Sequence, residues 1–346
     1  MHKIIVTTGY MGSGSSAFTD LISEFQGFQY NRGSFEYIFL HCPNGLFDLE
    51  DKLLINNNAL RSDEALASFR SEMDDLFFKF NWWPSNYKEM LSPQFMSIVD
   101  TFIASLINTS SDSYWYHQQK LNSIQNLKSI LYYIAKCLTG GRINKVVLNR
   151  RPMKIAIPSP EEFYEKAKDF LDNIFIELGV EEHPLLIDQL LLPHNLWRFD
   201  RYFDSNVFCI VVDRDPRDVF LSNKYIWAQN NQPVPFPFEV NEFCDYYRRM
   251  RKSVKPFEHP NIIEVHFEDL IYNYDSTIIS ICDLIDLPPE KHIRKKQLFR
   301  PDESINNTQL FNDPRFRSET EIIQRELDEF LYQFPYKHEI NIEHIF

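Results

Sequence analysis

A short glycine-rich turn near the N-terminus has the residue types and spacing of an anion-binding loop. Residues 9–16 read GYMGSGSS and follow the phosphate-loop pattern G-x-x-x-x-G-K-[ST], with Ser15 in place of the lysine. Glycines allow backbone N–H groups to crowd around an anion, and the start of the following helix adds a positive dipole end. Such a loop can hold an anion without lysine, and a plain glycine-rich turn without a ligand is the alternative interpretation. The residues expected to contact the anion are Gly12, Ser13, Gly14, Ser15 and Ser16.

A second stretch, residues 209–225 (CIVVDRDPRDVFLSNKY), combines a strand end with a basic residue and a hydroxyl group. An apolar run is followed by Arg214, and Ser222 lies eight residues beyond it. Asp215 is suited to cap the next helix. Ligands bind at the carboxyl ends of strands in open α/β sheets, and an arginine with a hydroxyl group makes a compact phosphate site. The alternative is a routine ion-pair network of Arg214 or Arg217 with the neighbouring aspartates, which are Asp213, Asp215 and Asp218.

A third stretch, residues 265–287 (VHFEDLIYNYDSTIISICDLIDL), completes a set that resembles the sulfotransferases that use 3′-phosphoadenosine 5′-phosphosulfate. In that family a loop of the type P-[KR]-S-G-[ST]-[ST] holds the phosphosulfate. An arginine followed by a serine eight residues later binds the 3′-phosphate. Residues 11–16, Arg214 and Ser222 match these positions in the family's order. The resemblance implies a P-loop NTPase-like fold with this nucleotide as co-substrate and no metal.

The first loop departs from the family pattern at one position. Gly12 aligns with the lysine or arginine that, in the family, stabilises charge on the transferring group and on the leaving phosphate. Loss of this contact removes an electrostatic contribution of roughly several kcal/mol unless another cation replaces it. The candidates for the replacement remain open: Arg150, Arg151 and Lys154, which follow a predicted strand, or Arg217.

Sulfuryl transfer to a hydroxyl group is an in-line displacement that needs positioning, charge stabilisation and a base for the hydroxyl proton. In the resembled family this base is a glutamate soon after the second strand, or a histidine at a strand end. Glu36, within YNRGSFEYIFLH (residues 30–41), resembles the glutamate arrangement, and capping of the next helix is its alternative role. Asp188, which ends the strand-like LLID, is the second candidate, and His194 is the third.

The elements that must position these residues follow from the hydrophobic pattern. Short apolar runs predict buried strands, and the segments between them have helical periodicity. The predicted strands are residues 3–8, 145–149, 185–188, 206–212 and 261–267. The predicted helices are one that begins near residue 15, capped by Ser15 or Ser16, and residues 160–179, 216–230, 239–257 and 275–286. This alternation favours an α/β fold, a P-loop NTPase-like parallel sheet flanked by helices.

Residues 43–140 interrupt the alternation and are interpreted as a helical insertion within a single domain that spans residues 1–346. The helical patterns in it are residues 59–79, 92–107 and 118–139. Its many aromatic residues are expected to form the insertion's own core, and a surface that stacks on an acceptor is the alternative.

Residues 295–311 form a polar segment with a basic lead-in near the C-terminus. In the resembled family a basic segment of this region often closes over the nucleotide. Arg300, Ser304 and Asn306 are the candidates for this role, and a solvated loop without a ligand is the alternative.

The overall composition limits the classes of partner. The chain of 346 residues has a net charge of −13. This argues against non-specific binding of nucleic acid or of an acidic membrane, because either needs a broad basic surface. Five scattered cysteines are typical of reduced thiols rather than of a disulfide framework or a zinc site. No stretch has the length and hydrophobicity of a signal-peptide core or a membrane span, so a cytoplasmic location is expected.

These patterns predict a sulfotransferase that moves a sulfuryl group from the nucleotide to a hydroxyl group. By family analogy the acceptor is a carbohydrate or a glycolipid. A non-catalytic nucleotide-binding or scaffold protein of the same fold is the alternative that Gly12 invites. A nucleotide-dependent kinase is disfavoured by the missing lysine and by the lack of an evident pair of Mg²⁺-binding acids in the sequence.

Overall fold

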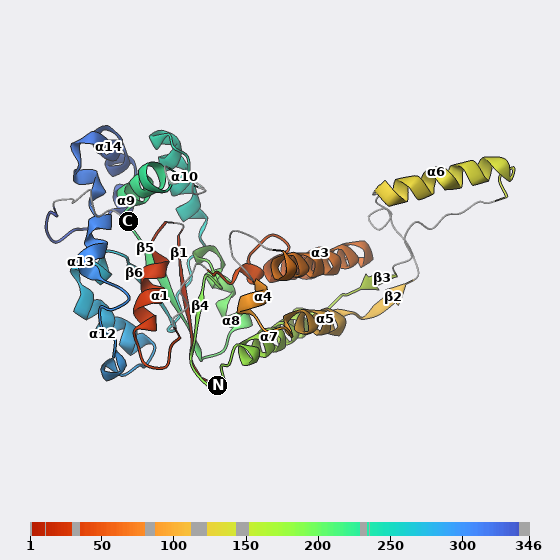
Figure 1. The fold of residues 1–346 in the computed structure, drawn as a ribbon, viewed down its shortest axis with the longest axis horizontal. Helices are drawn as coiled ribbons and strands as arrows, with labels where there is room; N and C mark the ends of the chain where they lie inside the picture. Colours follow the sequence, from red (N-terminus) through yellow and green to blue (C-terminus); the bar gives the residue numbers. More distant parts are fainter. Residues whose placement is uncertain are drawn as a thin grey trace. The chain divides into compact units, whose positions relative to one another are not determined.

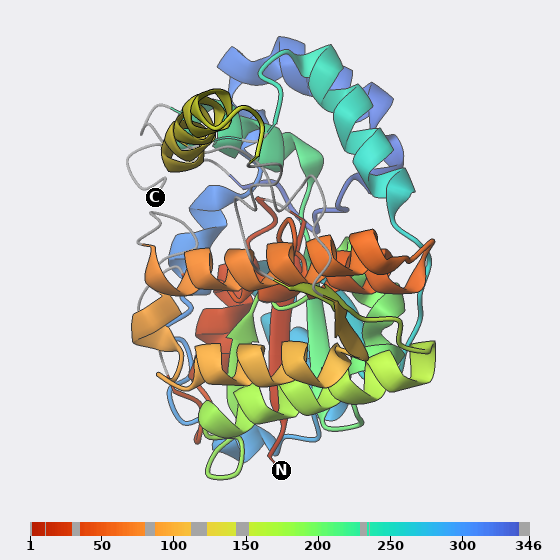
Figure 2. The same ribbon diagram turned by 90° about the vertical axis from the view of Figure 1, so that its right-hand side faces the viewer.

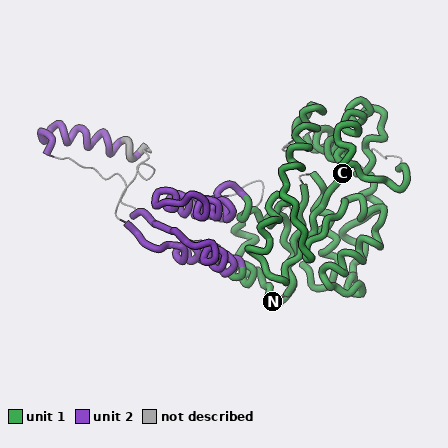
Figure 3. Tube along the Cα trace, turned by 180° about the vertical axis from the view of Figure 1, so that it is seen from behind, with its two compact units in different colours: residues 1–41, 80–92, 172–346 green, residues 42–79, 93–171 purple. Residues whose placement is uncertain are grey.

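The computed structural model describes residues 2–10, 12–29, 35–79, 87–111, 123–142, 152–228, 234 and 236–338. The chain forms two compact units (Figure 3). Unit 1 comprises residues 1–41, 80–92 and 172–346, and unit 2 comprises residues 42–79 and 93–171. The segment interpreted as an insertion, residues 43–140, falls in unit 2 apart from residues 80–92, and unit 2 continues beyond it to residue 171.

Unit 1 contains a parallel sheet of four strands in the order β4-β1-β5-β6 (Figure 1). The strands are β1 (Ile4–Gly9), β4 (Leu185–Asp188), β5 (Val207–Asp213) and β6 (Ile262–His266). The predicted parallel α/β fold is confirmed, with four of the five predicted strands, and residues 145–149 lie outside the described part of the chain. In the register, Thr7 lies opposite Asp188 and Gly9 lies opposite Val212. The carboxyl ends of these strands therefore meet at one edge of the sheet.

Helices follow the strands as the periodicity predicts, with one irregularity at the predicted helix 216–230. There, α9 (Pro216–Leu221) continues as a π-helical turn, Ser222–Trp227. The other helices that lie within unit 1 are α1 (Ser15–Ser23), α4 (Tyr87–Met90), α8 (Phe199–Tyr202), α10 (Val240–Ser253), α11 (Asp269–Tyr272), α12 (Tyr274–Leu284), α13 (Pro301–Ser304) and α14 (Arg317–Glu326). Short 3₁₀ turns occupy Ile38–Leu40, Pro193–Arg198, Pro289–Lys291, Ile305–Asn307, Leu310–Asn312, Pro314–Phe316 and Asp328–Phe330.

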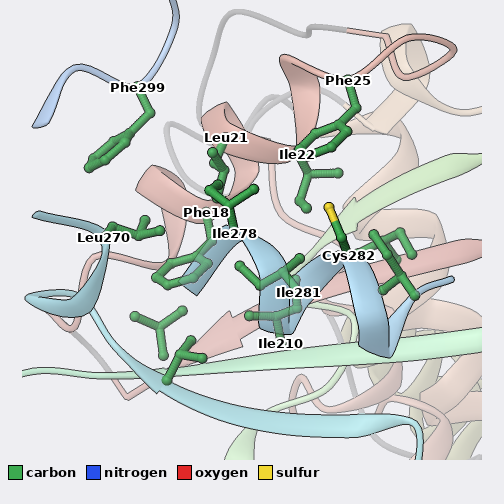
Figure 4. Packing of buried hydrophobic residues seen from close by; sticks show 14 of the residues in the cluster. Phe18, Leu21, Ile22, Phe25, Ile210, Leu270, Ile278, Ile281, Cys282 and Phe299 are labelled. Carbon is green, nitrogen blue, oxygen red and sulfur yellow. The ribbon is translucent and has the colours of Figure 1, made fainter. Parts of the chain in front are cut away.

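The main core of unit 1 lies between the sheet and the helices α1 and α12 (Figure 4). Phe18 and Leu21 of α1 pack with Ile210 of β5 and Ile281 of α12, and all four side chains are fully buried. Every residue of β1 is buried as well. Because successive side chains of a strand point to opposite faces, the sheet is covered on both sides, as expected for parallel strands.

Unit 2 is built mainly from helices around an aromatic core. Its helices are α2 (Leu46–Leu54), α3 (Ala59–Phe78), α5 (Phe95–Leu106), α6 (Ser123–Leu138) and most of α7 (Pro160–Glu177), and β2 (Thr109–Ser111) pairs antiparallel with β3 (Met153–Ile155). Figure 2 shows α5 and α7 running alongside each other, and the rings of Phe102 and Phe170 stack between them at 4.7 Å. Phe69 and Phe163 extend this cluster. Phe69 and Phe102 of the predicted insertion therefore lie in the core of the unit, together with Phe163 and Phe170, which follow the predicted insertion in the sequence.

Replacing Phe18 with alanine should lower the free energy of unfolding by about 3–5 kcal/mol, because the substitution leaves a cavity in the main core. Urea denaturation followed by circular dichroism measures the change. Ile279 on α12 is 55% exposed, so Ile279→Ala is a matched control that should change stability by less than about 0.5 kcal/mol. Equal effects of the two substitutions would contradict the assignment of Phe18 to the core.

Candidate anion-binding site

The glycine-rich turn connects the end of β1 to the start of α1. Gly12 and Gly14 have φ angles of +81° and +85°, in the left-handed region that favours glycine. Gly14 occupies the cap position of α1 without a side-chain cap bond, so the predicted capping by Ser15 or Ser16 is wrong. The first N–H groups of a helix have no partner within the helix. They remain available to an anion, together with the positive end of the dipole.

The position that carries lysine in the resembled family cannot hold a side chain without rearrangement. A Cβ atom on Gly12 would lie 2.9 Å from Nδ2 of Asn223 and 3.4 Å from Cγ1 of Val219. Asn223 belongs to the π-helical turn that follows α9 and is 1% exposed. The backbone of the loop and the packing of this helix therefore both favour glycine here.

Arg214 lies at the centre of the site, just after β5, and is 2% exposed. Its Nη1 donates to the backbone oxygen of Gly12 at 3.1 Å, and its Nη2 donates to Oγ of Ser222 at 3.1 Å. Nη2 also donates to the backbone oxygen of Asn307 at 2.6 Å. The first loop and the arginine–serine pair, which are about 200 residues apart in sequence, are thus in direct contact.

The third predicted stretch reaches the same place through Phe267. The guanidinium of Arg214 lies 5.1 Å from the centre of this ring. On the other side, a Cβ atom on Gly14 would lie only 2.8 Å from Cδ2 of Phe267. The aromatic ring therefore packs against both the loop and the arginine, and all three sequence motifs meet at one point.

Several buried polar atoms around Arg214 have no hydrogen-bond partner among the described residues. They are Oγ of Ser13, Nε of Arg214 and the side-chain oxygens of Asn223 and Asn307. Buried polar groups are normally paired, and an amide side chain can turn to present N–H instead of oxygen. Their concentration around one guanidinium fits a site for a polar, anionic ligand.

The aspartates of the DRDPRD segment are engaged with groups other than the side chain of Arg214, whose backbone N–H donates to Asp213 at 2.8 Å. Asp213 receives two bonds from Arg251, at 2.6 and 2.7 Å. Asp215 caps α9 and receives two further bonds from the Arg217 side chain, at 2.7 and 2.9 Å. The predicted alternative of an ion-pair network therefore holds for Arg217. Among the described residues, no carboxylate lies within ion-pair distance of Arg214.

Two buried acids lie near Arg214 without forming an ion pair with it. Asp218 accepts backbone N–H groups of Gln309 and Leu310, each at 2.8 Å. Burial, followed by repulsion from Asp215, raises the pKa of Asp218 to about 7 and raises the pKa of Glu268 well above its ordinary value. Both groups therefore compensate the arginine's charge less than ordinary carboxylates would.

The two carboxyl groups proposed as bases lie together at the end of β4. The backbone N–H of Tyr37 donates to the backbone oxygen of Asp188 at 3.0 Å, which places Glu36 beside the strand end. Asp188 also accepts a bond from Oγ1 of Thr7 at 3.2 Å. Burial, followed by repulsion from Glu36, raises the pKa of Asp188 to about 7. Asp188 lines a cavity of about 40 Å³, and the other lining residues are Thr19, Ser23, Gln29, Phe35, Tyr37, Met90 and Leu186.

His194, the third candidate base, lies on the Tyr10 side of the loop. Its ring meets that of Tyr10 edge-on at 6.1 Å, and Arg251 stacks on the same tyrosine at 3.9 Å. Burial lowers the pKa of His194, and the nearby charge of Arg251 lowers it further. The imidazole is therefore neutral near pH 7 and retains a free electron pair for a proton.

Of the cations predicted to replace the lysine, Arg217 is described within unit 1, and it is engaged with other groups. Arg217 is held by Asp215, and its guanidinium stacks on Phe311 at 3.7 Å. Lys154 lies in β3 of unit 2, and residues 150 and 151 are outside the described part of the chain. Arg300 is exposed and forms an ion pair with Glu303 at the surface. Ser304 ends α13, and Asn306 bonds to the backbone oxygen of Glu303 at 3.2 Å.

Three site residues were not identified from the sequence. Gln189 bonds through its amide group to Ser15 at 2.9 Å and to Thr8 at 3.1 Å, which ties the end of β4 to the loop. Asn223 directly follows Ser222 in the sequence, and this adjacency could have indicated that it belongs to the site. Asn307 contributes a backbone oxygen, for which a sequence carries no signal.

Comparison with known proteins identifies the class of enzyme. Residues 160–321 match the family model described as the sulfotransferase domain, a segment that includes Arg214, Ser222 and residues 265–287 but not the first loop. Residues 160–321 therefore form a sulfotransferase domain, and the protein is an enzyme of sulfuryl transfer. No curated protein matches the chain.

Three solved structures align with nearly the whole chain. The sulfotransferase domain from the curacin biosynthetic pathway is 12% identical, covers 97% of this chain and 99% of that chain, and has a TM-score of 0.40. The sulfotransferase domain from the Synechococcus PCC 7002 olefin synthase is 13% identical, covers 97% of this chain and 90% of that chain, and has a TM-score of 0.39. Sulfotransferase STF9 from Mycobacterium avium is 12% identical, covers 98% of this chain and 78% of that chain, and has a TM-score of 0.34. At these identities and TM-scores the likenesses are distant, and the assignment depends on the domain match.

Within the described ranges, no three or more side chains of the His, Cys, Asp and Glu types are grouped to hold a metal ion. None of the helices in this part of the chain combines the length and the hydrophobicity needed to cross a membrane.

The carboxyl group of Asp188 should titrate with a midpoint near pH 7 in carbon-detected NMR, and the midpoint should fall in Glu36→Gln because one source of repulsion is removed. The folded protein keeps this proton between about pH 4 and 7, whereas the unfolded chain releases it. Asp188 therefore lowers stability increasingly as pH rises through this window. As pH rises from 4 to 7.5, the free energy of unfolding of Asp188→Asn should increase by about 1–4 kcal/mol relative to that of the wild type.

Asp302→Asn is the matched control for this measurement, because it removes a carboxylate from an exposed position. Its stability difference from the wild type should stay nearly constant over the same pH range. A titration midpoint of Asp188 near pH 4 would contradict the burial of its charge next to Glu36.

Proposed function

We propose that this sulfotransferase takes its sulfuryl group from 3′-phosphoadenosine 5′-phosphosulfate and transfers it to a hydroxyl group of an acceptor. The observation that carries the proposal is the buried guanidinium of Arg214, which contacts Ser222 and the first loop at once and has no ion-pair partner among the described residues. A buried cation without a counter-charge is costly, so this geometry favours an anionic ligand. A nucleotide with separate 3′ and 5′ anionic groups supplies one anionic group for the Arg214–Ser222 pair and one for the first loop.

The roles of the residues follow from their chemistry. Arg214 and Ser222 would hold the 3′-phosphate, and the N–H groups and hydroxyls of residues 12–16 would hold the phosphosulfate. Since Gly12 provides no cation, dipoles must stabilise the charge on the transferring group, and Asn223, whose Nδ2 borders the Cβ position of Gly12, is a further side chain that can add one.

Glu36 is the proposed base for the acceptor hydroxyl, with Asp188 as the alternative. The two groups lie together, and the raised pKa of Asp188 leaves this carboxyl group partly protonated near pH 7. The member of the pair that is ionised would accept the hydroxyl proton.

The acceptor is proposed to be a carbohydrate or a glycolipid on the basis of the family resemblance. Phe69, Phe102, Phe163 and Phe170 of unit 2 are buried in its own core, so they do not add support for a sugar-stacking surface. A scaffold protein without activity remains the second candidate, because the loop lacks the family's cation. Transfer of radiolabelled sulfate from the donor to a panel of glycans and glycolipids separates the two.

Arg214→Ala should remove most of the preference for 3′-phosphoadenosine 5′-phosphate over adenosine 5′-phosphate, a loss of about 10- to 150-fold in relative affinity, because a charged hydrogen bond contributes about 1.5–3 kcal/mol. Calorimetric titration without metal ions measures both affinities. Ser222→Ala should lower the same preference by about tenfold or less, since it removes a neutral donor.

Arg315, exposed and paired with Asp313, provides the control, and Arg315→Ala should keep the full preference. Ser222→Ala tests the same clamp with a smaller truncation, so the test does not depend on correct folding of the Arg214 variant. If both site variants discriminate the 3′-phosphate as well as the wild type does, the proposed clamp is wrong.

Glu36→Gln should lower turnover by about 10²- to 10⁴-fold on a true acceptor while nucleotide affinity stays within about twofold, because the group acts on the hydroxyl proton only. Steady-state transfer assays and calorimetry give the two values. Full turnover in Glu36→Gln together with loss in Asp188→Asn would move the role of base to Asp188.

A further inference from the structure

Helix α6 (Ser123–Leu138, yellow in Figure 1) carries a row of exposed apolar side chains. The exposed fractions are 65% for Ile124, 58% for Leu127, 57% for Ile130, 56% for Leu131, 48% for Ile134 and 82% for Leu138. At 3.6 residues per turn, these positions fall within an arc of about 120° on one side of the helix. No other described helix has more than two large apolar side chains at this exposure.

The sequence around α6 is basic, in contrast to the rest of the chain. Residues 113–160 contain eight lysine and arginine residues and no aspartate or glutamate. Of the 36 basic and 49 acidic residues of the chain, this leaves 28 basic and 49 acidic residues elsewhere, an excess of 21 negative charges. On the helix itself, Lys128 lies beside the apolar stripe and Lys136 opposite it, and both are exposed. The net charge of −13 therefore conceals a local positive region.

We propose that α6 binds the surface of an anionic membrane, with the apolar stripe among the acyl chains and the lysines at the lipid phosphates. A basic amphipathic helix of this kind combines hydrophobic insertion with electrostatic attraction, and a lipid surface offers both partners at once. The acidic remainder of the chain is repelled by the same lipids, so contact is restricted to this helix.

Two other occupants fit the observations less well. A second copy would bring the same basic helix against itself, with no acidic side chain on it to pair with Lys128 and Lys136. Docking onto the chain's own acidic surface would satisfy the lysines. However, the other described elements offer only scattered exposed apolar side chains to cover the stripe.

Membrane binding would also bring the enzyme to acceptors held in a lipid surface. This consequence alone rests on the proposed function, and it favours the glycolipid over the free carbohydrate as the acceptor class. Binding itself is independent of the transfer reaction, so it can be measured without nucleotide and without acceptor.

Flotation of the full chain with vesicles tests the proposal. The wild type should rise with vesicles that contain phosphatidylglycerol and not with vesicles of phosphatidylcholine alone, and about 1 M salt should weaken the binding because it screens exposed charges. Ile130→Ser with Ile134→Ser, and separately Lys128→Glu with Lys136→Glu, should each lower the partition coefficient by about tenfold or more.

Matched control variants exist elsewhere on the chain. Ile279 and Ile293 are 55% and 58% exposed, so Ile279→Ser with Ile293→Ser removes the same kind of surface without touching α6. Lys88→Glu with Lys291→Glu makes the same change of charge at exposed positions outside the helix. Both controls should float as the wild type does.

Cys137 gives a direct readout, because it lies on α6 and is the only exposed cysteine of the five. A polarity-sensitive fluorophore on it should shift to shorter wavelength with phosphatidylglycerol vesicles. Failure of the wild type to float with these vesicles, or equal binding by the α6 variants, would overturn the proposal. A wild-type dimer in ultracentrifugation that Ile130→Ser with Ile134→Ser dissociates would instead identify a second copy as the occupant.

Discussion

The candidate site depends on one buried positive charge. Arg214 follows β5 directly and is 2% exposed, yet its guanidinium contacts only neutral acceptors among the described residues. A buried charge that meets only neutral groups lowers the stability of the fold. The arrangement is understandable if the fold preserves this charge for an anion that arrives from outside. The raised pKa values of Asp218 and Glu268 have the same consequence, because protonation reduces the negative charge that would otherwise neutralise the arginine.

The acids next to Arg214 organise the surrounding chain. Asp213 binds Arg251 and so fixes the helix α10 against the strand end. Asp215 caps α9, holds Arg217 and accepts the backbone N–H of Tyr332. Asp218 accepts the backbone of residues 309 and 310, and this fixes the segment whose Asn307 oxygen contacts Arg214. Each acid thus ties a segment distant in sequence to the carboxyl end of β5, and together they hold the arginine in one conformation.

The sequence was sufficient for the fold and for the contact of Arg214 with Ser222 and the first loop, because both depend on local patterns. Apolar runs placed β1, β4, β5 and β6 within about one residue of their observed bounds, and the spacing of Arg214 and Ser222 corresponds to two turns of the helix that follows β5. The cap of α1 was missed because its glycine takes a left-handed conformation that replaces a side-chain cap. Gln189 and Asn307 were missed because their contacts depend on the tertiary arrangement. The positive charge of residues 113–160 is evident from the sequence, but it is hidden when only the net charge of the whole chain, −13, is considered.

The neutral loop changes how charge must be distributed on the acceptor side. In the resembled family, a lysine or arginine at this position stabilises charge on the transferring group and on the leaving phosphate. With Gly12 in that position, two fully ionised carboxylates near the loop would repel an anionic donor without compensation. The raised pKa of Asp188 relieves part of this repulsion, because the group keeps a proton over much of the range below pH 7. If the proposed donor and base assignments hold, the absence of the lysine and the pairing of Glu36 with Asp188 are physically linked, since protonation of one carboxyl group substitutes in part for the missing cation.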